Sequence, residues 1–122
     1  MLSNLGRIIG QNARQYGERP AVVNLERGRR FSYLQMHRLT NRMSHMLTSG
    51  FGLGEGDVYA NILENEHVAF FHPWMFKCPV TSAWVDIRES VSEQLKQLDY
   101  IRPKIVFLEA GVLENLLDPL LE

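Results

Sequence analysis

The sequence contains few of the features that mark secreted or nucleic-acid-binding proteins. Cys78 is the only cysteine among the 122 residues, so no disulfide can form within the chain and we expect a reducing compartment. The 13 Lys and Arg residues nearly balance the 14 Asp and Glu residues, and the formal net charge is -1. This balance argues against nucleic acid as a main partner, because nucleic-acid-binding domains usually carry a basic patch.

Long apolar runs are missing as well. No segment approaches the roughly 20 apolar residues that a membrane-spanning helix needs, so no transmembrane segment is predicted. The first residues do not combine a basic stretch with an apolar core, so we expect no secretory signal. With 45% hydrophobic and 22% charged residues, the composition is that of one ordinary globular domain.

The chain also lacks recognisable catalytic and metal-binding motifs. His67 and His72 are five residues apart, whereas the helical zinc motif has two histidines four residues apart with a glutamate between them. No Gly-x-Ser-x-Gly segment is present to expose a reactive serine, and the apolar neighbours of Cys78 predict an inert thiol. We therefore predict no catalytic, no cofactor-binding and no metal-binding residue.

The glycines at positions 50, 52, 54 and 56 resemble a dinucleotide-binding loop, but their context is reversed. A phosphate-binding glycine loop follows a strand and begins a helix, so that the phosphate meets the helix N-terminus. Here a predicted helix comes before the glycines and a predicted strand comes after them. We interpret them as the end of that helix and the turn into the strand.

What the sequence does contain is a strand–helix–strand pattern between residues 57 and 86. Apolar runs at 58–63 and 80–85 predict two strands. Asn65 is placed to cap a helix that fills the segment between them and ends near Lys77. This is the size of a βαβ unit, for which we expect a right-handed crossover. The continuous apolar character of both strands indicates a sheet covered on both faces.

The residues before this unit predict a helix and a hairpin. Apolar side chains recur at helical spacing between Leu5 and Tyr16, and Ser3 is a candidate cap. Residues 21–25 and 30–33 predict two strands joined by a polar turn, whose arginines we interpret as solvent-exposed charges.

A second N-terminal helix is predicted after the hairpin. Ser32 and Gln35 fit a capping box at its start. Its inward face carries Met36, Met43 and Met46. A methionine-rich face is either part of a core, which we favour, or an adaptable binding surface.

The residues after the βαβ unit continue the alternation. Ser90 and Glu93 fit another capping box, at the start of a helix that ends at Pro103. Residues 104–108 predict a third strand, and 111–117 predict a short helix before Pro119.

The predicted fold class is therefore α/β. We expect a single layered, Rossmann-like domain over residues 1–122, with a mainly parallel sheet flanked by helices and an N-terminal β-hairpin. Apolar residues of this domain are expected to remain exposed and to form an interface. The candidates are Phe70, Phe71, Trp74 and Met75, and the last helix with Val112, Leu113, Leu116, Leu117, Leu120 and Leu121.

Several short segments occur in the same order in one known family. They are residues 19–22, 31–36 with 41–43, 52–58 with 64–65, 77–88 and 104–107. Each segment is weak alone, but the ordered series resembles the N-terminal subdomain of AMP-forming acyl-CoA synthetases, in the adenylate-forming superfamily. The chain departs from the family pattern at Pro73, Pro79, Trp84 and Asp86.

The resemblance implies a parent enzyme of the long-chain fatty-acid–CoA ligase type. Such a parent activates a carboxylic acid with ATP to an acyl-adenylate and transfers the acyl group to CoA, so ATP, Mg and CoA are implied cofactors. The family's phosphate loop, adenine motif, magnesium-binding glutamate and C-terminal lysine come later than the matched segments. We therefore expect this chain to be an inactive scaffold portion. The parent is expected to be cytoplasmic or peripheral to a membrane.

Two partners and one alternative function follow from these observations. The remainder of the parent synthetase is the expected partner, and a homodimer through the exposed apolar surface is the second. The alternative is a stand-alone, non-enzymatic α/β module that binds a protein partner. The gene sequence after Glu122 distinguishes the two functions.

Overall fold

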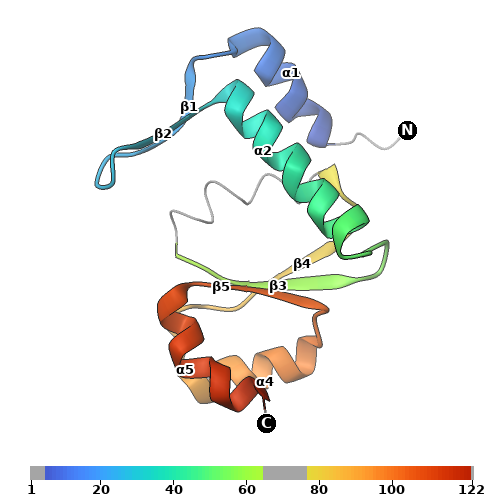
Figure 1. The fold of residues 1–122 in the computed structure, drawn as a ribbon, viewed down its shortest axis with the longest axis vertical. Helices are drawn as coiled ribbons and strands as arrows, with labels where there is room; N and C mark the ends of the chain where they lie inside the picture. The colour runs from blue at the N-terminus through green and yellow to red at the C-terminus, as the bar shows by residue number, and fades with distance from the viewer. Residues whose placement is uncertain (1–4, 65–76, 122) are drawn as a thin grey trace. The chain divides into compact units, whose positions relative to one another are not determined.

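The computed structural model describes residues 5–64 and 77–121, and it shows an α/β fold (Figure 1). The described residues divide into two compact units. The N-terminal unit contains residues 5–54 and 77–79, and the C-terminal unit contains residues 55–64 and 80–121. Whether the two units make up the one domain expected over residues 1–122 stays a prediction.

The N-terminal unit consists of helices and a hairpin (Figure 1). Helix α1 (Gly6–Tyr16) leads into strands β1 (Pro20–Asn24) and β2 (Arg29–Ser32), which pair antiparallel. Helix α2 (Tyr33–His45) follows, packs against α1 and continues into the π-helical segment η1 (Met46–Gly50). The predicted N-terminal hairpin is confirmed, and the arginines of its turn are exposed.

Helix α2 begins where the sequence predicts, because its capping box forms completely. The Ser32 hydroxyl oxygen accepts a hydrogen bond from the Gln35 N–H at 3.0 Å, and Gln35 Oε1 accepts one from the Ser32 N–H at 2.8 Å. These bonds satisfy two N–H groups that a helix start otherwise leaves without partners. The cap of α1 is different, because its N-cap residue Leu5 makes no side-chain cap. Ser3 lies outside the described residues.

The glycine cluster after α2 forms turns, as predicted. Gly52 and Gly56 have φ angles of 71° and 89°, a region that glycine enters without the steric cost that a Cβ imposes. The Leu53 N–H donates to the Leu47 carbonyl at 3.0 Å, which closes the end of η1. The chain then enters the strand that begins at Val58.

The C-terminal unit contains a three-stranded parallel sheet in the order β4-β3-β5. Strand β3 (Val58–Ile62) lies between β4 (Thr81–Trp84) and β5 (Ile105–Leu108). Both predicted strands of the βαβ unit are confirmed, and so is their parallel direction. The helix expected between them, including Phe70, lies outside the described residues. The handedness of its crossover stays a prediction.

Helices α4 (Val91–Ile101) and α5 (Ala110–Leu121) pack on one face of this sheet (Figure 1). They enclose the core of the C-terminal unit, whose buried members are Ala60, Ile62, Val85, Leu98, Val112 and Leu116. Side chains alternate along a strand, so Tyr59 and Asn61 lie on the other face of β3. The inward face predicted for α4 is confirmed, because Val91, Leu95 and Ile101 pack against this core.

Two expectations for the C-terminal helices need correction. Helix α5 does not end before Pro119, which lies inside its last turn. Only two residues of the helix follow Pro119, so the bond that its missing N–H removes belongs to the last turn. The capping box of α4 is only half formed. The Ser90 hydroxyl oxygen accepts from the Glu93 N–H at 3.2 Å, while the Glu93 carboxylate pairs with Lys96 at 3.3 Å.

Fewer apolar residues of the last helix are exposed than expected. Val112 and Leu116 are buried in the core, because residues four apart lie on one helix face and this face meets the sheet. The exposed large apolar residues of α5 are Leu113, Leu117, Leu120 and Leu121. The other expected apolar patch, with Phe71, Trp74 and Met75, lies outside the described residues.

Candidate functional site

Helix α1 approaches α2 closely because its inner face carries small residues. Gly6, Gly10 and Ala13 are buried on this face. A Cβ at Gly10 would lie 3.3 Å from Cε1 of His37, so the His37 ring occupies the space that a larger residue would need. The small residues of α1 therefore set the position of a titratable side chain of α2.

Lys77 is held by three residues of α2. Its Nζ donates to Oδ1 of Asn41 at 2.7 Å and to the carbonyl oxygen of His37 at 3.1 Å, and it lies 2.9 Å from Nδ1 of His37. His37 and Asn41 are four residues apart and so lie on one face of α2. Ser44 continues that face, and its hydroxyl donates to the Lys77 carbonyl at 3.3 Å. These contacts fix the lysine at both its ammonium and its backbone.

This geometry sets the protonation of both residues. An ammonium group has donors only, so Nδ1 of His37 must accept, and the neutral ring carries its proton on Nε2. Burial lowers the pKa of Lys77 to about 8, and its three acceptors are all uncharged. Burial also lowers the pKa of His37 below 6.5, and the charges of Lys77, Arg14 and Arg38 lower it further. At neutral pH the pair is therefore mainly an ammonium beside a neutral imidazole.

A cavity of about 710 Å³ lies beside this cluster, within the N-terminal unit. Helix α1 contributes Arg7 and Arg14 to its wall. Helix α2 contributes His37, Asn41 and His45, and Lys77 also lines the cavity. None of the described residues that line it is an aspartate or a glutamate. Electrostatically, such a cavity attracts anions. We refer to it below as the basic pocket.

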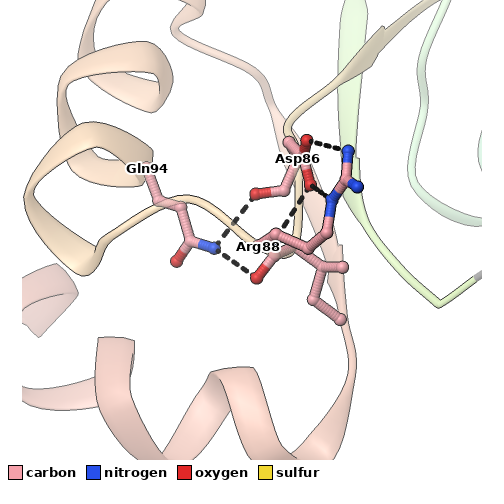
Figure 2. Close-up of polar contacts among 4 residues, drawn as sticks. Asp86, Arg88 and Gln94 are labelled. Carbon is pink, nitrogen blue, oxygen red and sulfur yellow. Dashed lines mark hydrogen bonds and ion pairs between the residues drawn. The ribbon is translucent and has the colours of Figure 1, made fainter.

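A second polar cluster lies directly after β4, in the C-terminal unit (Figure 2). The Asp86 carboxylate accepts from Nε and Nη2 of Arg88, at 3.1 and 2.9 Å, and from the Arg88 N–H at 2.8 Å. The hydrogen bonds from the Arg88 side chain, followed by that from its N–H, lower the pKa of Asp86. Asp86 is one of the departures from the family pattern, and here it orders the turn that follows the strand.

Helix α4 supports the same turn. Nε2 of the buried Gln94 donates to the carbonyl oxygens of Asp86 and Ile87, at 3.3 and 3.4 Å (Figure 2). Buried amide groups need such partners, because an unpaired one costs about 1–3 kcal/mol. The loop after β4 is therefore held from two sides, by Arg88 and by Gln94.

The carboxyl ends of parallel strands are where open α/β sheets usually bind ligands. At this edge the Glu64 N–H, after β3, donates to Oε1 of Glu109, after β5, at 2.9 Å. At the opposite edge Lys104 pairs with Asp57 at 2.9 Å. In the described part of the chain, no group of three or more His, Cys, Asp or Glu residues is placed to hold a metal ion.

Of the residues that the sequence offered as chemical candidates, Cys78 alone lies in the described part of the chain. His67 and His72 lie outside the described residues. Cys78 is half-buried next to Lys77, and its inertness stays a prediction. Within residues 5–64 and 77–121, no helix is long and apolar enough to cross a membrane.

The basic pocket was not predicted, although part of its signal is local. Arg7 and Arg14 are seven residues apart, which is about two turns and places them on one side of α1. His37 and Asn41 have the same-face spacing on α2. Lys77 lies 40 residues beyond His37, and no local pattern connects it to these helices.

Several solved structures share the fold of this chain. It is similar to the inhibitor-bound N-terminal domain of FACL13 from Mycobacterium tuberculosis, with a TM-score of 0.79 and 24% identity over 89% of this chain and 27% of that chain. A Mycobacterium tuberculosis fatty acyl CoA synthetase gives a TM-score of 0.77 and 24% identity, over 88% and 21%. O-succinylbenzoate coenzyme A synthetase (MenE) from Bacillus subtilis, in complex with AMP, gives 0.71 and 19%, over 84% and 26%.

The chain has the fold of the acyl-CoA synthetase N-terminal domain. The resemblance predicted from the sequence is confirmed in the fold, and so is the α/β class with its parallel sheet and N-terminal hairpin. The chain spans only about a quarter of the length of these structures. No protein-family model and no curated protein matches its sequence.

Proposed function

We propose that this chain is the scaffold portion of an AMP-forming acyl-CoA synthetase. The parent would activate a carboxylic acid with ATP to an acyl-adenylate and transfer the acyl group to CoA. The observation that carries the proposal is the agreement in fold with the FACL13 N-terminal domain over 89% of the chain. We propose a fatty acid as the substrate, because one similar structure is a fatty acyl CoA synthetase.

ATP and magnesium are the cofactors that we propose for the parent. Structures of MenE with AMP, and with ATP and a magnesium ion, have the same fold over 84% of this chain. Adenylate formation relies on positioned phosphate donors and a metal ion. The segments that provide these groups in the family come later than the matched ones, so the chain alone is proposed to be inactive.

The proposal is tested by the gene sequence that follows Glu122 and by an exchange assay. We expect the reading frame to continue into a Ser/Thr/Gly-rich phosphate loop. The longer protein should then catalyse ATP–pyrophosphate exchange that depends on a fatty acid, measured over short-, medium- and long-chain acids. The 122-residue chain should give no exchange above a buffer blank.

Two outcomes contradict this proposal. Exchange by the 122-residue chain, in protein free of host synthetase, means that the chain is not a scaffold. A native stop codon after Glu122 favours the alternative, a stand-alone module that binds a protein partner.

The exposed leucines of α5 support the proposed partners. Leu113, Leu117, Leu120 and Leu121 follow one another at helical spacing and are 41–77% exposed. Contiguous exposed apolar residues on a soluble protein usually mark an interface. In the parent we propose that they contact the remainder of the synthetase. In the isolated chain we propose that they form a two-fold dimer.

Light scattering over a dilution series tests the dimer. Leu117→Glu places a charge in the middle of the leucine face and should convert the dimer to a monomer. Leu25→Glu is the matched control, because Leu25 is 90% exposed in the hairpin turn and is not part of the leucine face of α5. A wild-type chain that stays monomeric at high micromolar concentration contradicts the dimer.

A further inference from the structure

We propose that the basic pocket of the N-terminal unit binds a small phosphate-bearing anion, through the guanidinium groups of Arg7 and Arg14 with the Lys77 ammonium behind them. The proposal rests on the residues of this unit alone. It does not depend on the activity proposed for the parent enzyme.

The first argument is the charge of the wall. Among the described lining residues, Arg7, Arg14 and Lys77 are mainly positively charged at neutral pH and none carries a negative charge. Within residues 5–64 and 77–121, no carboxylate pairs with Arg7 or Arg14. Each guanidinium therefore keeps its fork of N–H donors for a ligand, and this fork matches the oxygens of a phosphate group.

The second argument is that the lysine and the two arginines would contribute to binding in different ways. The ammonium of Lys77 has three donors, and the contacts with His37 and Asn41 occupy all of them. It therefore supplies charge at a fixed point and offers no free N–H. Direct hydrogen bonding to a ligand falls to Arg7 and Arg14, which line the pocket and are exposed.

The third argument concerns the class of anion. The described lining consists of glycine and polar or charged residues, so this part of the pocket offers no large apolar side chain to a fatty acyl chain. Arg7 and Arg14 lie about 10 Å apart along the α1 axis, from 1.5 Å of rise per residue. Two cations at that spacing suit a ligand with more than one negative charge, such as a diphosphate or a phosphate ester. The volume of about 710 Å³ lies within the range of small-molecule sites.

Titration calorimetry of the full 122-residue chain with inorganic pyrophosphate, at constant ionic strength, tests the proposal. We expect one site. Arg7→Gln and Arg14→Gln should each weaken binding by about tenfold or more, because each removes charge-assisted hydrogen bonds. Arg19→Gln and Arg30→Gln remove the same charge from exposed positions outside the pocket, and they should change the affinity less than about twofold.

A second readout reports on the site itself. A bound anion favours the charged form of a nearby amine. In an NMR titration the pKa of Lys77 should therefore rise above its value of about 8 when pyrophosphate is present. Sulfate at the same ionic strength, with its two charges, should raise it less.

Three results overturn the proposal. The first is no pyrophosphate binding at millimolar concentration by a chain whose circular dichroism shows it to be folded. The second is an equal loss of affinity in the pocket variants and in the Arg19 and Arg30 controls. The third is binding of the chain to phosphatidate vesicles that persists when pyrophosphate is in excess. If pyrophosphate does displace the vesicles, the phosphate in the pocket is assigned to a lipid headgroup.

Discussion

The contacts inside the N-terminal unit differ in kind from the contacts inside the C-terminal unit. The C-terminal unit encloses a continuous apolar core between its sheet and two helices. In the N-terminal unit, by contrast, α1 meets α2 through Gly6, Gly10 and Ala13. A complete capping box at Ser32 and the hydrogen bonds of Lys77 add to this contact. Apolar burial is non-directional and scales with area, whereas hydrogen bonds depend on the position of each atom.

This difference predicts how each unit responds to substitution. Removing a buried side chain from the C-terminal unit leaves a cavity and loses apolar burial. Changing one residue of the N-terminal unit removes a hydrogen bond, which is worth about 1 kcal/mol, or changes the distance between α1 and α2. The four predictions below test this contrast, in order of decreasing effect on stability.

The largest effect is expected at Leu116. Its side chain is fully buried, so Leu116→Ala should lower the free energy of unfolding by about 2–5 kcal/mol. Leu121→Ala is the matched control on the same helix, because Leu121 is 77% exposed, and it should change stability by less than about 0.5 kcal/mol. Denaturant unfolding measures both. Equal losses would show that α5 does not pack on the sheet.

The helix caps give the next effect. Ser32→Ala removes the acceptor of a complete, buried capping box and should cost about 1 kcal/mol, whereas Ser32→Gly should cost only a few tenths. Ser90→Ala should cost less than Ser32→Ala, because the cap of α4 is exposed and water can bond to the Glu93 N–H that loses its partner, whereas Ser32 is buried. Denaturant midpoints decide this order. The interpretation of Ser32 as a cap fails if its Ala and Gly variants lose the same stability.

Two glycines in helices provide a smaller and more specific comparison. Among the described residues, apart from the neighbouring backbone of α5, nothing lies within 4 Å of a Cβ built at Gly111, so Gly111→Ala should stabilise the chain by up to about 1 kcal/mol. At Gly10 of α1 the new Cβ would lie 3.3 Å from His37. Gly10→Ala should therefore gain less, and it should weaken the Lys77–His37 contact. Equal gains in thermal unfolding would mean that the His37 ring moves aside freely.

The same contrast explains what could be predicted from the sequence. The strands at 58–62, 81–84 and 105–108 and the caps at Ser32 and Ser90 depend on local composition, so their patterns were sufficient. The extension of α5 past Pro119 was missed because the proline was expected to end the helix. In the structure the proline lies in the last turn of α5. The basic pocket was missed because Lys77 reaches His37 and Asn41 across about 40 residues, and no periodicity expresses such a contact.

The role of Asp86 was also missed from the sequence. The sequence shows Asp86 only as a departure from the family pattern, whereas its contact with Arg88 shows that it has a local structural role. Asn61 is a further example. Its side chain is buried, and among the described residues it has no hydrogen-bond partner, although the sequence placed it within an apolar run. The contacts of such polar residues depend on their three-dimensional surroundings, so the sequence alone did not predict them.

The smallest effect on stability is expected from pH, through His37. Its pKa in the folded chain is lowered from 6.5, first by burial and then by Lys77, Arg14 and Arg38. As the pH falls below 6.5, the unfolded chain therefore binds this proton before the folded chain does, so stability falls with pH in this window. Well above pH 6.5 the ring is neutral in both states, and its titration has no effect there.

The variant His37→Gln should remove this loss of stability on acidification. Glutamine keeps an oxygen that can accept from the Lys77 ammonium, but it does not titrate. His45→Gln removes another histidine of the basic pocket and controls for the loss of one imidazole. Unfolding midpoints between pH 5 and pH 7.5 measure the slopes, and nitrogen-15 NMR at pH 7.5 should show the proton of His37 on Nε2. A wild-type slope in His37→Gln, or a proton on Nδ1, would contradict the arrangement in which Lys77 donates to this ring.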